Sequence, residues 1–175
     1  MNKHTGISLL KFASCLTNSR DIRSFCQNVF IEYSQGNTII YSTNGHVAIR
    51  VVVDDEFIFG GHVGVAGVDG INNAYKTGLL DLVEIKVESD VRRPPLEKVF
   101  VENNNTPDDK VGLDVKYLSL ITSSMVKLAK DLGTRQSGVV FHKTNATGAN
   151  FLSFDIDLRT GFLIKILVAI MPMKI

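Results

Sequence analysis

The sequence predicts an α+β domain built from two similar halves, each a helix followed by three or more strands. Two segments have apolar residues at helical spacing, whereas the segments after them alternate or are rich in β-branched residues. The same order of elements occurs twice, which indicates a pseudo-repeat in organisation. At 175 residues, with 45% hydrophobic and 21% charged residues, the chain has the composition of one globular domain.

The first half begins with a predicted helix and continues as three strands. Apolar residues recur at helical spacing from Ile7 to Leu16. Two extended runs, Val29–Tyr33 and Thr38–Tyr41, flank the turn Gln35-Gly36-Asn37 and predict a hairpin. The β-branched run Val47–Val53 is typical of a buried strand, so it becomes the third.

A poorly patterned region separates the halves. The glycine-rich segment Gly60–Gly70 lacks the lysine of a phosphate-binding loop, so we expect a flexible connection. Leu79–Val87 is predicted to be a strand, or a short helix followed by a strand. The polar segment 102–110 is a loop between half-domains of about 1–101 and 111–175.

The second half repeats the pattern. Apolar residues share one face of a predicted helix from Val115 to Leu132, and Gly133 is a natural stop. Three strands are expected after it, at Val139–Phe141, Phe151–Ile156 and Phe162–Met171.

Basic residues concentrate in the two helical segments, although the net charge is only +1. Residues 1–26 and 115–135 together hold eight of the 19 basic residues but two of the 18 acidic ones. We therefore expect basic helices and acidic sheets. On the second helix Lys116, Lys127 and Lys130 share the face opposite the apolar one. Such a face is either solvated or able to neutralise phosphates.

The sequence contains no catalytic pattern. His4, His46, His62 and His142 lack the spacing of metal ligands. Asp155 and Asp157 fit a solvated strand face better than a cation site. Neither of the two cysteines has a histidine close in sequence, and no nucleophile elbow occurs. We therefore expect neither an enzyme nor a bound metal or cofactor.

The longest apolar stretch, Ile166–Met171, is far shorter than the ~20 residues of a membrane helix. The first residues do not form a secretory signal, because Lys11 interrupts their apolar run. The expected location is the cytoplasm, with no membrane partner.

Four short segments, taken in order, resemble one domain of the bacterial DNA polymerase sliding clamp, the β-clamp. Thr43-Asn44-Gly45-His46 is similar to the family's T-D-G-H turn, and residues 93–99, RPPLEKV, to its Y-P-D-Y-x-x-V passage. Residues 114–118, DVKYL, resemble its N-x-K-Y-L helix opening. The ending 170–175, IMPMKI, resembles its V-M-P-M-R-L tail.

The resemblance implies a single clamp-like domain, residues 1–175, with two helices packed on one face of antiparallel sheets. In the family the helices line a ring around DNA, so the resemblance implies non-specific binding of duplex DNA during replication or repair. The basic residues expected to face DNA are Lys11, Arg20, Arg23, Lys116, Lys127 and Lys130.

The resemblance also implies a hydrophobic cleft that captures short peptide motifs of replication or repair proteins. Carried over residue by residue, this cleft consists of Thr43, Gly45, His46, Met171, Pro172 and Met173. A ring would require several copies of so small a domain, and hence a homo-oligomer, or else insertion beside another clamp. The alternative is a stand-alone interaction module that binds or competes for clamp partners without encircling DNA.

Overall fold

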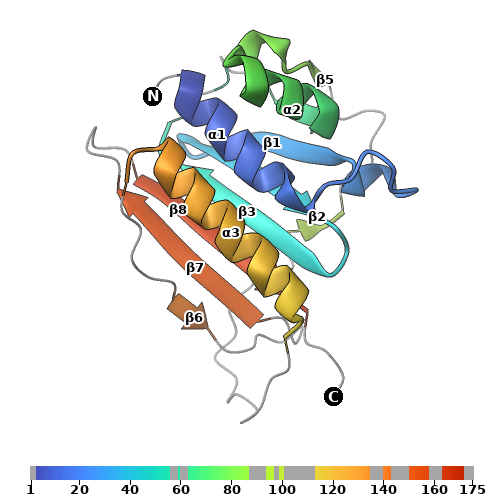
Figure 1. Ribbon diagram of the computed structural model, residues 1–175, viewed down its shortest axis with the longest axis vertical. Helices are drawn as coiled ribbons and strands as arrows, with labels where there is room; N and C mark the ends of the chain where they lie inside the picture. Colours follow the sequence, from blue (N-terminus) through green and yellow to red (C-terminus); the bar gives the residue numbers. More distant parts are fainter. Residues whose placement is uncertain are drawn as a thin grey trace.

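A computed structural model shows three α-helices against one β-sheet (Figure 1). It describes residues 3–55, 59, 63–86, 94–96, 99–100, 113–134, 140–142, 150–157 and 163–171. The predicted loop 102–110, and with it the boundary between half-domains, lies outside these residues.

Within these residues the sheet has eight strands, all paired antiparallel, in the order β5-β4-β1-β2-β3-β8-β7-β6. The strands are β1 (Asn28–Ser34), β2 (Asn37–Thr43), β3 (Val47–Val53), β4 (Gly64–Gly67), β5 (Ile85–Lys86), β6 (Val140–His142), β7 (Asn150–Asp157) and β8 (Leu163–Ile170). The three strands predicted in each half are confirmed, and their ends differ from the predicted ends by at most two residues.

The turn between β1 and β2 forms where the sequence predicts it. Gln35 and Gly36 both have positive φ, 52° and 79°, and Ser34 pairs with Asn37. A two-residue turn of this kind matches the twist of a hairpin.

The strands β3 and β8 join the two parts of the sheet. Seven residue pairs connect them, from Val47↔Ile170 to Val53↔Ile164. A helix and three strands therefore occur twice in the chain, and the third strand of each set lies beside the other at the centre of one sheet.

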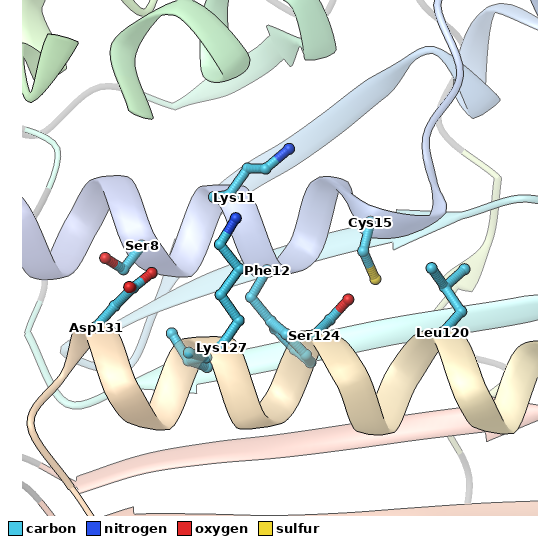
Figure 2. A pocket seen from close by; sticks show the side chains of 9 residues that line it. Ser8, Lys11, Phe12, Cys15, Leu120, Ser124, Lys127 and Asp131 are labelled. Carbon is cyan, nitrogen blue, oxygen red and sulfur yellow. The ribbon is translucent and has the colours of Figure 1, made fainter. Parts of the chain in front are cut away.

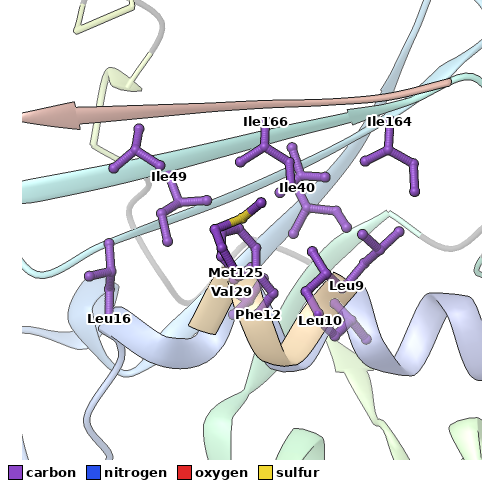
Figure 3. Packing of buried hydrophobic residues seen from close by; sticks show 14 of the residues in the cluster. Leu9, Leu10, Phe12, Leu16, Val29, Ile40, Ile49, Met125, Ile164 and Ile166 are labelled. Carbon is purple, nitrogen blue, oxygen red and sulfur yellow. The ribbon is translucent and has the colours of Figure 1, made fainter. Parts of the chain in front are cut away.

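Side-chain alternation separates two apolar clusters. Along β3 and β8, every second residue faces the helices, as Ile49 and Ile166 do in Figure 3. There they meet Phe12 and Met125 from two helices. The helices thus cover one face of the sheet, as the resemblance implies. The opposite face carries a smaller cluster that includes Phe30, Tyr41, Leu96 and Phe100.

Helix α1 (Lys3–Ala13) is buried around most of its circumference, and Ser14–Leu16 extends it as a 3₁₀ turn. It lies between the other two helices in Figure 1, so only Lys11 interrupts a long run of buried residues. The predicted helix therefore exists but starts four residues earlier than expected.

Helix α3 (Val115–Asp131) has a capping side chain at its start and the predicted glycine just after its end. The Asp114 carboxylate accepts the Lys116 backbone N–H at 2.8 Å, a typical N-cap. Gly133 follows the helix with φ 65°, which confirms it as the stop.

The prediction of a flexible connection at Gly60–Gly70 is wrong for the described residues 63–70. Gly64–Gly67 is strand β4, and helix α2 (Val68–Thr77) follows it directly. The helix is short, buries only Val68, Ile71 and Ala74, and follows several glycines, which hid its period. Gly78, with φ 74°, ends it. Next, a 3₁₀ turn (Leu80–Leu82) leads into β5, which matches the second alternative for 79–87.

Among the helices of the described ranges, none is long and apolar enough to span a bilayer.

Two buried serines provide a matched test of this packing. The Ser42 hydroxyl on β2 donates to the carbonyl of Ala13 at 2.6 Å, whereas the buried Ser8 hydroxyl on α1 has no hydrogen-bond partner among the described residues. We expect Ser42→Ala to lower the free energy of unfolding by about 1–3 kcal/mol, since a buried carbonyl loses its donor. Ser8→Ala should leave it unchanged or raise it, because an unsatisfied hydroxyl is removed. Urea unfolding of both variants measures this, and a larger loss for Ser8→Ala would contradict the packing.

Candidate functional site

The turn between β2 and β3 is fixed by its own side chains. The Thr43 hydroxyl accepts the Gly45 N–H at 3.0 Å and donates to the Val47 carbonyl at 2.8 Å. The Asn44 side-chain oxygen accepts the N–H groups of His46 and Val47 at 3.0 and 2.9 Å. Such local bonds hold a turn in one conformation. With φ 87°, Gly45 adopts a backbone conformation that favours glycine.

The end of the described chain lies directly beside this turn. The Met171 N–H donates to the His46 carbonyl at 2.9 Å, which extends the β3–β8 pairing by one bond. The Met171 side chain is 46% exposed, whereas Ile170 before it is buried. Thr43, Gly45, His46 and Met171 are therefore brought together within one chain. Pro172 and Met173 lie outside the described residues.

Arg23, which we expected on the DNA-facing side, contacts the turn instead. Its guanidinium donates to the Asn44 carbonyl at 3.0 Å and makes two bonds to the Asp21 carboxylate, at 3.0 and 2.9 Å. A Cβ atom added at Gly45 would lie 2.5 Å from Arg23 Nη1, so the arginine packs over this glycine. The hydrogen bonds from Arg23 lower the pKa of Asp21 to about 2, so the pair stays charged well into acidic pH.

Tyr117, from the first turn of α3, also contacts the turn. Its ring stacks on that of His46, with centroids 6.1 Å apart and planes at 21°. Tyr117 belongs to the motif 114–118, which we interpreted only as a helix opening. Its aromatic ring was the feature of the sequence that could have indicated a contact surface. We define the turn surface as Arg23, Thr43–His46, Tyr117 and Met171.

The other predicted basic residues divide between a loop and the helices. Arg20 is exposed in the loop before the 3₁₀ turn Ser24–Cys26, where its N–H bonds to Asn18. Lys116, Lys127 and Lys130 are exposed on α3, as the helical period predicts, and Lys11 is half-buried on α1.

The three helices are basic, as expected, but the strands are not acidic. The helices carry six lysines, of which Lys3 and Lys76 were not among our predicted sites, and two aspartates, Asp69 and Asp131. The strands carry three acidic and three basic residues, namely Glu32, Asp155, Asp157, Arg50, Lys86 and Lys165. Other acidic residues of the described ranges, such as Asp54, Asp55 and Glu84, belong to connecting segments, which the sequence pattern could not separate from strands.

A groove of about 260 Å³ lies between α1 and α3 (Figure 2). Its lining residues are Ser8, Lys11, Phe12, Cys15, Leu120, Ser124, Lys127, Leu128 and Asp131. Burial raises the pKa of the Cys15 thiol to about 11, so this thiol is protonated at neutral pH and a poor nucleophile. Within the described part of the chain, no group of three or more His, Cys, Asp or Glu side chains could hold a metal ion.

The fold is similar to that of DNA sliding clamps. A crystal structure of the DNA polymerase sliding clamp from Pseudomonas aeruginosa with ligand superposes with a TM-score of 0.69 at 11% identity, over 100% of this chain and 66% of that one. The DNA polymerase III subunit beta from the same organism gives 0.59 and 12%, over 97% and 65%. No family model and no curated protein matches the sequence.

The architecture is therefore a clamp-like α+β fold, as the four sequence motifs indicate. At these identities the likeness shows the fold alone, and the chain spans just under two thirds of the clamp chains that it matches.

Proposed function

We propose that this protein is a non-catalytic, clamp-like factor of DNA replication or repair in the cytoplasm. It associates with duplex DNA through its three helices and recruits partner proteins through the turn surface. The observation that carries the proposal is the excess of lysines on the helices of a clamp-like fold, six against two aspartates.

Binding of DNA by this face needs no base recognition. Exposed lysines such as Lys116 and Lys130 neutralise phosphates, and each contact releases counterions irrespective of sequence. Lys3 contributes less, because it is paired with Asp81 at 2.9 Å.

The turn surface suits an extended or turned peptide with apolar side chains. Met171 provides an adaptable apolar contact, and the stacked rings of His46 and Tyr117 provide a flat one. The predicted residues Pro172 and Met173 would extend the same surface.

Self-association is part of this proposal, because one domain of this size cannot enclose a duplex. The strands at the ends of the described sheet, β5 and β6, supply backbone groups that can pair with a second chain.

One observation favours the alternative of a stand-alone interaction module. The turn surface is complete in a single chain apart from the residues after Met171, so capture of a clamp-binding peptide requires no ring. In that case the protein competes with a clamp for partners and binds DNA weakly.

If the helices bind DNA, removal of their positive charge should lower the affinity for duplex DNA in a salt-dependent way. Lys116→Gln with Lys130→Gln should weaken binding of a fluorescent duplex about tenfold and reduce the slope of log K against log salt by about 2. Fluorescence anisotropy at several salt concentrations measures both quantities.

The matched control is Lys86→Gln with Lys165→Gln, which removes two lysines from strands. If the control pair weakens binding as much as the helical pair, the helices do not form the DNA-binding face. If the unaltered protein does not bind duplex DNA at low salt, the alternative function is favoured.

If the turn surface binds peptides, removal of residues 171–175 should weaken binding of peptides copied from the clamp-binding segments of bacterial polymerases. We expect a loss of about tenfold or more, or about 1.4 kcal/mol, because the apolar side of the turn surface is lost. Calorimetry with Leu79→Ala as a control, an exposed apolar residue after α2, tests this. Unchanged affinity on truncation would exclude the turn surface.

A further inference from the structure

We propose that Lys11 on α1 and Lys127 on α3 hold a single phosphate group above the groove between these two helices. Its ligand is a phosphodiester of the nucleic-acid backbone. The identity of the ligand rests on the proposed function, whereas the anion site rests on the contacts described next.

Helix α2 brings the two groove lysines together. The Lys11 ammonium donates to the Asn72 side-chain oxygen at 2.6 Å, and Lys127 Nζ lies 4.6 Å from the centroid of the Tyr75 ring. Tyr75 lies three residues after Asn72 on α2, so the side chains that contact Lys127 and Lys11 are neighbours on that helix. Figure 2 shows Lys127 extending from α3 toward α1, with its nitrogen beside the Lys11 side chain.

The contacts of these lysines leave their charge uncompensated. The partner of Lys11 is a neutral amide and that of Lys127 a neutral ring, and within the described residues neither ammonium forms an ion pair. Asp131, the one carboxylate lining the groove, accepts a hydrogen bond from the Tyr75 hydroxyl at 2.6 Å.

Without a bound anion, the positive charges of Lys11, Lys76 and Lys127 repel one another. Partial burial lowers the pKa of Lys11, and the charges of Lys127 and Lys76 lower it further, while Cys15 acts in the opposite direction. A bound anion would remove this repulsion. Lys11 uses one of its three N–H donors on Asn72, which leaves two for the oxygens of a phosphate.

The surroundings favour a phosphate within a polymer. The site lies on the helices that also expose Lys116 and Lys130, so a backbone that places one phosphate over the groove can bring its neighbours to these lysines. A free anion would use only the groove lysines. The site would thus fix the path of the strand across the helices without reading bases.

The test follows the lysine ε-CH₂ signals of the full chain by NMR during titration with inorganic phosphate. We expect the signals of Lys11 and Lys127 to move, those of Lys116 and Lys130 to stay, and the pKa of Lys11 to rise on binding. Lys127→Gln should abolish the response of Lys11. Asp131→Asn, which retains an acceptor for Tyr75 but removes a charge, should strengthen phosphate binding about two- to fivefold.

Asp69→Asn is the control for Asp131→Asn, because it removes a charge from an exposed position on α2. Equal effects of the two changes, or equal responses of all four lysines, would overturn the site.

A second arm uses a short duplex and separates the two proposals. Lys11→Gln and Lys127→Gln should each weaken duplex binding, and the double variant should be little weaker than either single one, because both lysines hold one phosphate. If the double variant binds as tightly as the unaltered protein, the phosphate is not that of DNA. If the unaltered protein responds to phosphate at Lys11 and Lys127 but does not bind the duplex, the proposed function is wrong and the anion site remains.

Discussion

The pairing of β3 with β8 is the interaction on which the rest of the structure depends. It joins strands whose paired residues, such as Val47 and Ile170, are more than a hundred positions apart in the sequence, at the centre of the sheet. Its register sets which side chains enter the core. A shift of one residue would turn Ile164, Ile166 and Val168 away from the helices, because strand side chains alternate. Such a shift would expose these apolar side chains to water, and the free energy that it would cost stabilises the observed register.

Both candidate surfaces follow from this register. On the helical side, it places α1 and α3 over one continuous core, so that their facing sides enclose the groove, and α2 lies on the other side of α1 (Figures 1 and 2). At the end of the ladder, it leaves the Met171 N–H opposite the His46 carbonyl, next to the turn that Arg23 and Tyr117 cover. The same two strands therefore position both the lysine-bearing helices and the turn surface within one chain.

Sequence patterns predicted the elements with strong periods and missed those that depend on distant partners. The extended runs of β1 and β2, the apolar face of α3 and the stop at Gly133 are local signals, and each is confirmed. Helix α2 has only three buried residues and follows glycines, so its neighbours rather than its period stabilise it. The four motifs indicated the turn and Met171, but they could not indicate Arg23 as a contact of that turn. Its role depends on a glycine 22 positions away that leaves room for a guanidinium. The contacts of Lys11 and Lys127 likewise depend on α2, which was not predicted.

The central claim is that the β3–β8 ladder unites both parts of the chain in one cooperative sheet, and native-state hydrogen exchange tests it most directly. The account predicts that amides of β3 and β8 exchange at similar rates, among the slowest in the protein, and that Met171 is protected with them. If β1–β3 were protected while β7, β8 and α3 exchanged rapidly, the C-terminal part would open separately. The turn surface and the groove would then not be features of one stable fold.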